Sequence, residues 1–238
     1  MPETNMSDLN APPLNPIPWV VWVLALPMIA MEVVVQAGAN GLAGGPAGIG
    51  WRALAMQTLG FAPDYLRQMV TLWQFPLDGL YRLVSYALVN QTLTQAVFVV
   101  VILLALGKFV AEVYAWWAVL LTYLAASAVG AVAYTALPIS HAGLLGGYPG
   151  NYGLIGAYTF LLWVRLAGQG SFQAFRLIGF FMVFQVAVAG FGIALYGIEQ
   201  GTTWQFIADL AGFVTGFALA FVVSPGGWAR VLVKLRST

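Results

Sequence analysis

Long apolar stretches separated by short polar segments dominate the hydrophobic pattern of this chain. A helix that crosses a bilayer needs about 20 mostly apolar residues. Six stretches approach that length: 19–36, 93–110, 116–137, 152–166, 177–196 and 204–223. The fourth is short, and Pro27 and Glu32 interrupt the first. The pattern predicts an all-α membrane protein with six transmembrane helices.

Residues 37–92, between the first two predicted spans, have a different pattern. They open with the glycine-rich segment AGANGLAGGPAGIG and continue with aromatic residues among scattered charges. This segment is too polar to span the membrane and too apolar to be a free loop. It predicts one or two amphipathic helices in the membrane interface, with tryptophans at the depth of the lipid headgroups.

Composition supports a membrane location and excludes several kinds of site. Only 7% of the residues are charged and 61% are hydrophobic, whereas a soluble domain has about 25% charged residues. The absence of cysteine excludes disulfides, thiolate catalysis and cysteine-bound metals. The single histidine, His141, argues against a histidine metal site or a haem site. We expect no metal and no cofactor, and no basic cluster indicates a nucleic-acid partner.

The distribution of lysine and arginine predicts the orientation in the membrane. With the N-terminus in the cytoplasm, six basic residues fall inside and three outside, which favours cytoplasmic termini. The expected organisation is an N-terminal tail (1–18), a membrane domain (19–224) with an external loop (37–92), and a basic cytoplasmic tail (225–238). Short loops and the lack of cysteine favour a bacterial inner membrane.

The segment HAGLLGGYPG, just before the fourth apolar stretch, is apolar but not helical in pattern. Irregular backbone at membrane depth is tolerated only where protein or a water-filled cavity shields it. We therefore predict that this glycine-rich loop dips into the bundle and that the fourth helix begins partway down. A recess open to the outside would result.

Four segments in this order resemble the rhomboid family of intramembrane serine proteases. LYRLVSYALVN (80–90) resembles the external-loop motif of the family, with Tyr81 in place of tryptophan and Arg82 retained. The second span, with Gly107 and Glu112, GGYPGNYGLIGA (146–157) and ADLAGFVTGFALA (208–220) resemble the second, fourth and sixth spans. The resemblance covers about residues 75–224 and implies a six-helix bundle with lateral access for transmembrane helices.

The positions that carry the chemistry of the family are changed. An ungapped alignment places Tyr148 at the serine nucleophile, and an alignment with a one-residue deletion places Pro149 there. Asp209 stands at the histidine base, and Gln95 and Val99 stand at the oxyanion-stabilising histidine and asparagine. Acyl transfer needs an activated hydroxyl and donors aimed at the oxyanion. The resemblance therefore implies a pseudoprotease with no catalytic residues.

Polar residues inside the predicted spans are candidates for contacts or function. A carboxylate within a span costs about 2.5–3.5 kcal/mol on insertion scales, so Asp209 is expected to face a partner or a cavity. Its expected partners are Tyr148, Asn151 or backbone. The alternative is that Asp209 forms a polar or proton site in the pocket where rhomboid proteases have their active site. Glu32 is expected to reach the interface. Gln95 and Asn151 could line the pocket or join helices.

Small residues predict how the last helix packs. Gly212 and Gly216 form a small-xxx-small step, a pattern that lets backbones approach closely. The resemblance implies that this face packs the sixth helix against the fourth, which carries Gly153 and Gly156. Arg82 is expected to brace the external loop.

Three functional hypotheses follow. The leading one is a non-proteolytic membrane protein that binds or stabilises transmembrane helices of other proteins, as an assembly factor or a complex subunit within the lipid bilayer. The second is a rhomboid-type protease with altered residual activity. The third is a small transporter component that uses Asp209, against which stands the lack of an inverted repeat of broken spans.

Overall fold

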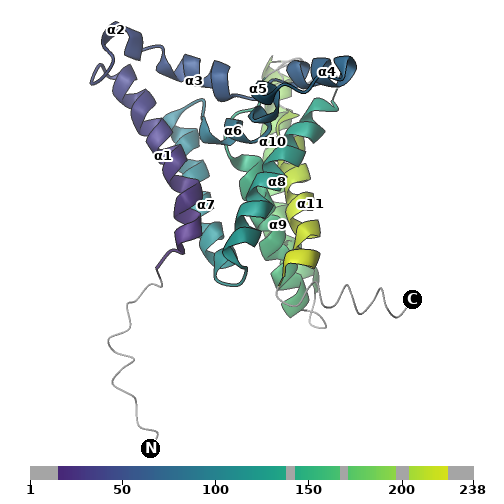
Figure 1. Cartoon of the computed structure of the whole chain (residues 1–238). Helices are drawn as coiled ribbons and strands as arrows, with labels where there is room; N and C mark the ends of the chain where they lie inside the picture. Colours follow the sequence, from purple (N-terminus) through teal and green to yellow (C-terminus); the bar gives the residue numbers. More distant parts are fainter. Residues whose placement is uncertain (1–15, 138–142, 167–170, 197–203, 225–238) are drawn as a thin grey trace, which may run out of the picture.

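The computed structural model describes residues 16–137, 143–166, 171–196 and 204–224. Six helices of at least 18 residues form the bundle in this part of the chain: α1 (Trp19–Ala39), α7 (Leu93–Ala111), α8 (Trp116–Thr135), α9 (Tyr148–Arg165), α10 (Arg176–Tyr196) and α11 (Phe206–Val223). Of these, α1, α7, α8 and α11 are long and apolar enough to cross a membrane. The prediction of an all-α membrane bundle is confirmed (Figure 1).

The fourth long helix, α9, begins earlier than predicted. It begins at Tyr148 rather than at residue 152 and has 18 residues. Gly147 is its N-cap and Pro149 lies in its first turn. Proline is tolerated there because the first backbone N–H groups of a helix have no partner within the helix. Hydropathy missed this turn because the sequence YPGN is not apolar.

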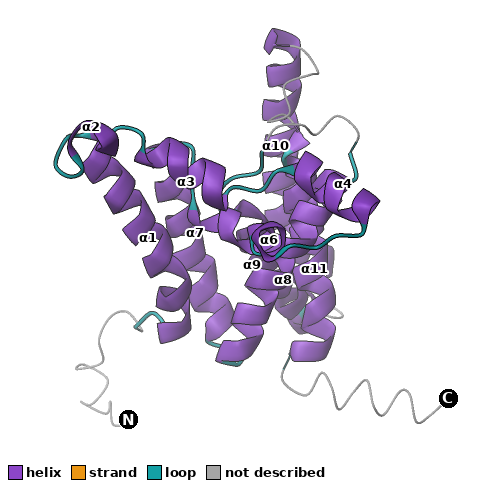
Figure 2. Cartoon of the chain, turned by 45° about the horizontal axis from the view of Figure 1, so that its top comes forward, coloured by secondary structure: helices purple, strands orange, loops and turns teal. Residues whose placement is uncertain are grey.

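The external loop contains more helices than expected. They are α2 (Gly45–Gly48), α3 (Trp51–Leu59), α4 (Pro63–Leu72), α5 (Leu77–Leu80), α6 (Arg82–Ser85) and the 3₁₀ turn η2 (Tyr86–Leu88). Figures 1 and 2 show these helices across one end of the bundle. Leu42, Trp73 and Leu77 of the external loop are each more than four-fifths exposed, which fits a segment that contacts lipid at the interface.

Helices α8, α9 and α11 form the tightly packed centre, and glycines allow the close approach of α9 and α11. A Cβ atom added to Gly216 would lie 2.5 Å from the carbonyl carbon of Gly153. A Cβ added to Gly156 would lie 2.7 Å from the backbone nitrogen of Phe217, and one on Gly212 would lie 2.9 Å from the carbonyl carbon of Pro149. Any larger residue at these positions would push the two helices apart.

The outer helices pack differently. On one side, α1 packs along α7, and a Cβ added to Gly107 of α7 would lie 2.8 Å from Val21 of α1. On the other side, α10 has only sparse contacts with α9 and α11. Three of its side chains, Phe180, Val183 and Phe191, are each about two-thirds exposed. Among the described helices of the bundle, α10 is therefore the one held least firmly.

Candidate functional site

The loop before α9 enters the bundle. Gly146 has a φ of 91°, a left-handed conformation that favours glycine. Leu144 is buried and pairs with Phe61 of the external loop through backbone hydrogen bonds of 2.9 and 3.2 Å. A Cβ on Gly150, in the first turn of α9, would lie 2.8 Å from the Ser127 hydroxyl. Because Ser127 stands about 12 Å along α8 from its last residue, Thr135, α9 begins well inside the bundle.

The two candidates for the nucleophile position have different surroundings. Pro149 is buried between neighbouring helices: a Cβ on Gly130 of α8 would lie 2.8 Å from the Pro149 Cβ, and Gly212 of α11 lies on another side of it. Tyr148 is partly buried and lines a cavity. Tyr148 is therefore the residue that faces the cavity, and Pro149 packs against α8 and α11.

The cavity beside Tyr148 lies between three helices of the bundle. Its volume is about 370 Å³. Its lining consists of Phe98 and Ile102 of α7, Tyr148, Asn151, Tyr152 and Ile155 of α9, and Phe181, Phe184 and Gln185 of α10. Mostly apolar walls with a few polar groups are typical of a ligand site. Phe98 and Phe184 are each more than half exposed, so the rim of this α7–α10 cavity faces out of the bundle.

Asp209 has a partner that differs from the expected ones. Its carboxylate is buried, with 4% exposure, in the first turn of α11, where the positive end of the helix dipole favours a negative charge. Gln185 Nε2 of α10 donates to Asp209 Oδ2 over 2.6 Å. The expected partners were Tyr148, Asn151 or backbone, and the structure has Gln185 instead. Gln185 is an isolated amide in the apolar run FFMVFQVAVAG, and this was the sequence signal that could have identified it.

The two oxyanion positions have structural contacts. Gln95 Nε2 donates to the carbonyl oxygen of Leu145 over 3.2 Å, and Gln95 Oε1 accepts from the backbone N–H of Gln91 over 2.9 Å. The Val99 side chain is fully buried. Its backbone oxygen accepts a hydrogen bond of 2.9 Å from Asn151 Nδ2. Both positions thus help to fix the loop and the start of α9.

The structure does not join the predicted polar residues into a hydroxyl–base pair. Among the described residues, no hydrogen bond connects Tyr148 with Asp209. Two buried oxygens on the cavity lining, Asn151 Oδ1 and Gln185 Oε1, have no hydrogen-bond partner. Two residues of the lining therefore have buried, unpaired acceptors. His141 lies outside the described residues.

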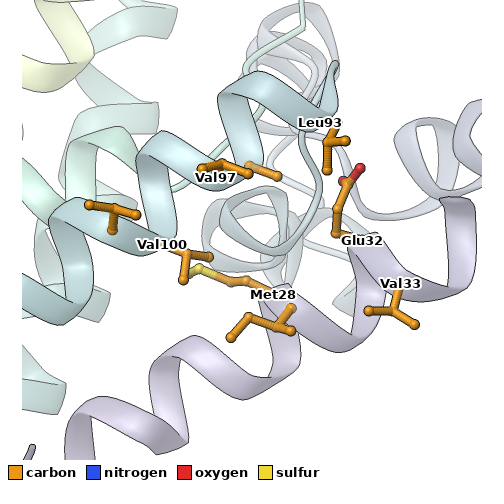
Figure 3. A pocket seen from close by; sticks show the side chains of 9 residues that line it. Met28, Glu32, Val33, Leu93, Val97 and Val100 are labelled. Carbon is orange, nitrogen blue, oxygen red and sulfur yellow. The ribbon is translucent and has the colours of Figure 1, made fainter.

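A second cavity, of about 260 Å³, lies between α1 and α7. Figure 3 shows Met28, Val97 and Val100 on its walls and the Glu32 side chain beside Leu93. The remaining lining residues are Ile29, Val33, Ala96 and Val101.

Glu32, which was expected to reach the interface, is bound by Arg52 of α3 in the external loop. The guanidinium of Arg52 donates to both carboxylate oxygens, over 2.5 and 3.1 Å, and to the carbonyl oxygen of Asn90 over 2.7 Å. Gln36 Nε2 donates to the same carboxylate over 3.0 Å. Glu32 is 8% exposed, so this is a compensated buried charge.

Tyr81 and Arg82 connect the short helices of the external loop to α3. The Tyr81 hydroxyl donates to the carbonyl oxygen of Thr58 over 2.9 Å. Arg82 donates to the carbonyl oxygens of Asp78, Gln57 and Gly60 over 3.1, 2.8 and 3.1 Å. Both side chains therefore hold loop backbone in place, and neither lines the α7–α10 cavity.

Comparison with known families bears on the whole arrangement. Residues 77–226, more than half of the 238-residue chain, match the Rhomboid domain. The chain belongs to the rhomboid family. The matched region begins at α5 and includes the five long helices α7, α8, α9, α10 and α11, each of at least 18 residues. A search of curated proteins found no significant match.

Proposed function

We propose that this rhomboid-family protein does not cleave peptide bonds, and that it binds transmembrane helices of other membrane proteins. In this role it is an assembly factor or a subunit of a membrane complex. The binding site is the α7–α10 cavity beside the start of α9.

The observation that carries this proposal is the state of Tyr148 and Asp209. Tyr148 is the hydroxyl residue at the nucleophile position that faces the cavity, and Asp209 stands where the family has its base. Asp209 accepts a hydrogen bond from Gln185, and Val99 has no group that could stabilise an oxyanion. Nucleophilic catalysis needs the base within hydrogen-bond reach of the nucleophile, together with donors at the oxyanion. These contacts favour binding over acyl transfer.

The form of the cavity supports a helical membrane partner. Its rim faces out of the bundle at Phe98 and Phe184, and α10, which forms one wall, has few contacts with its neighbours. A transmembrane segment could therefore approach from the lipid without passing through the external loop. Apolar and aromatic walls suit the side chains of such a segment.

We further propose a bacterial inner-membrane location with both termini in the cytoplasm. The first residues of α1 and the last residues of α11 lie at the same end of the bundle (Figure 1). Lys108 and Arg165 belong to the last turns of α7 and α9. An excess of lysine and arginine marks the cytoplasmic side of a multi-pass protein.

Reconstitution in vesicles tests both parts of the proposal. Acceptor-labelled single-span helices are added to the donor-labelled protein, and energy transfer reports binding while gel electrophoresis reports cleavage. We expect saturable binding, with the added helices left intact. Replacing Phe184 by tryptophan, which narrows the rim, should weaken binding, whereas Val132→Trp on the exposed face of α8 should not. Energy transfer that rises in proportion to the density of helices in the membrane, without saturating, would refute the binding role.

A further inference from the structure

The polar atoms that the α7–α10 cavity leaves unpaired are hydrogen-bond acceptors. Asn151 is 1% exposed, and its Nδ2 donates to the carbonyl oxygen of Val99. Because a carbonyl oxygen can only accept, this bond fixes the orientation of the amide. Asn151 Oδ1 is consequently the free end, and it has no partner.

Gln185 repeats this arrangement on the opposite wall. Its Nε2 donates to Asp209, which leaves Gln185 Oε1 buried and without a partner. Behind this amide lies the Asp209 carboxylate, which has a neutral hydrogen-bond donor rather than a cation in the described structure. The remaining polar groups on the lining, the hydroxyls of Tyr148 and Tyr152, can either accept or donate.

Such a cavity discriminates between side chains by their hydrogen-bonding character. A buried acceptor without a donor is unfavourable, and a ligand that brings a donor removes this cost. A carboxylate or other acceptor would add to it and would also be repelled by Asp209. An apolar side chain would gain packing alone.

The cavity has room for a long side chain. Its volume is about 370 Å³, and Phe98 and Phe184 are exposed at its rim. A partner helix at this rim inserts a single long side chain.

We infer that the cavity selects transmembrane helices that insert a lysine or arginine side chain between α7 and α10. This inference rests on the proposed helix-binding function and specifies the chemistry of the partner. The cationic group donates to Asn151 Oδ1 and Gln185 Oε1 and lies near the Asp209 carboxylate. Intramembrane charges of this kind are normally paired with one another.

Three synthetic single-span helices that differ at one central position test the inference. The central residue is lysine, methionine or glutamate, and binding to the reconstituted protein is measured by energy transfer. We expect the lysine helix to bind about three- to tenfold more tightly than the methionine helix, the range for an interhelical hydrogen bond in a membrane. The glutamate helix should bind more weakly than the methionine helix.

Variants of the protein test whether the cavity causes the preference for the lysine helix over the methionine helix. Asn151→Leu removes one acceptor, and Asp209→Asn removes the charge while retaining an acceptor for Gln185. Each should reduce the preference for lysine over methionine, and Asp209→Asn should also reduce discrimination against glutamate. The matched control is Thr159→Val on the same helix, since Thr159 also has a buried oxygen without a partner but lies outside the cavity lining. This control should keep the preference of the wild type.

The outcomes separate this inference from the function on which it rests. Equal affinities for the three helices would overturn the inference and leave helix binding intact. Failure of all three to bind would overturn helix binding itself. If Asn151→Leu does not fold, as judged by its thermal unfolding, Asp209→Asn decides, because it is nearly isosteric. An unchanged preference in that variant would overturn the inference.

Discussion

Glu32 and Asp209 are both buried carboxylates in membrane-spanning helices, but the chain gives them different partners. Glu32 is bound by the guanidinium of Arg52 through two hydrogen bonds, with Gln36 as a third donor. Asp209 is bound by the amide of Gln185. One acid thus has its countercharge within the chain, and the other has a neutral donor. Each of the two lies close to a cavity of the bundle.

The difference separates a structural acid from one available to a partner. The Glu32–Arg52 pair connects α1 to the external loop, and its charge is already compensated. Asp209 connects α11 to α10, the helix with the sparsest contacts, beside a cavity that has two unpaired acceptors. An ion pair therefore stabilises the α1 side of the protein, whereas the α10 side has unpaired polar groups that a partner could bind.

The largest effect is expected when Arg52 is removed. Arg52→Met leaves Glu32 buried without its cation, and breaking a buried pair in this way costs about 3–5 kcal/mol. We expect about 3 kcal/mol, the lower end, because the Arg52 side chain is 20% exposed. Denaturant unfolding in mild detergent measures this loss of stability. A loss below about 1 kcal/mol would show that Glu32 does not depend on Arg52.

A double variant tests whether Glu32 and Arg52 stabilise the protein as a pair. Replacing Glu32 and Arg52 together by methionine removes both charges, and apolar replacement of a buried pair is often close to neutral. The double variant should therefore be more stable than Arg52→Met alone, with a coupling free energy of about 1–3 kcal/mol. Additive losses in the double-mutant cycle would contradict a pairwise role of these residues.

A smaller effect is expected for Gln185. Gln185→Leu removes the hydrogen bond between α10 and α11, and such interhelical bonds contribute about 0.6 kcal/mol on average. Since α10 has few other contacts with α11, the loss should also increase its mobility. Spin labels at Phe180 and Val214 would report a broader distance distribution in this variant. An unchanged distribution would mean that this bond does not restrain α10.

The smallest effect on stability is expected for Asp209→Asn. The asparagine side chain retains an oxygen that can accept from Gln185 Nε2, so the free energy of unfolding should change by less than the roughly 0.6 kcal/mol expected for Gln185→Leu. A loss as large as that of Arg52→Met would abolish the contrast between the two acids. It would make Asp209 a structural residue like Glu32.

Sequence alone could predict the helices better than their side-chain partners. Apolar runs located the long helices to within a few residues, except for the first turn of α9, where Tyr148–Asn151 do not raise the hydropathy. Arg52 lies 20 residues from Glu32 and Gln185 lies 24 from Asp209. Each pair joins different helices, whose relative rotation is set by packing and not by spacing along the chain.

The candidate site could be predicted only in part, because contacts between helices depend on their packing in the folded chain. The resemblance to rhomboids pointed to Tyr148, Pro149 and Asp209, but only packing against Gly130 and Gly212 separates the role of Pro149 from that of Tyr148. An isolated glutamine among apolar residues, such as Gln185, indicates an interhelical contact without identifying its partner. Unpaired acceptors such as Asn151 Oδ1 become visible only in the folded chain.

The most direct test measures binding and cleavage in one sample. The purified protein is reconstituted in vesicles with a labelled transmembrane helix that carries a central lysine, and energy transfer and cleavage products are followed together. We expect saturable energy transfer while the helix stays intact. Cleavage of the helix by the wild-type protein, abolished by Tyr148→Phe or Asp209→Asn, would contradict the proposed non-proteolytic role.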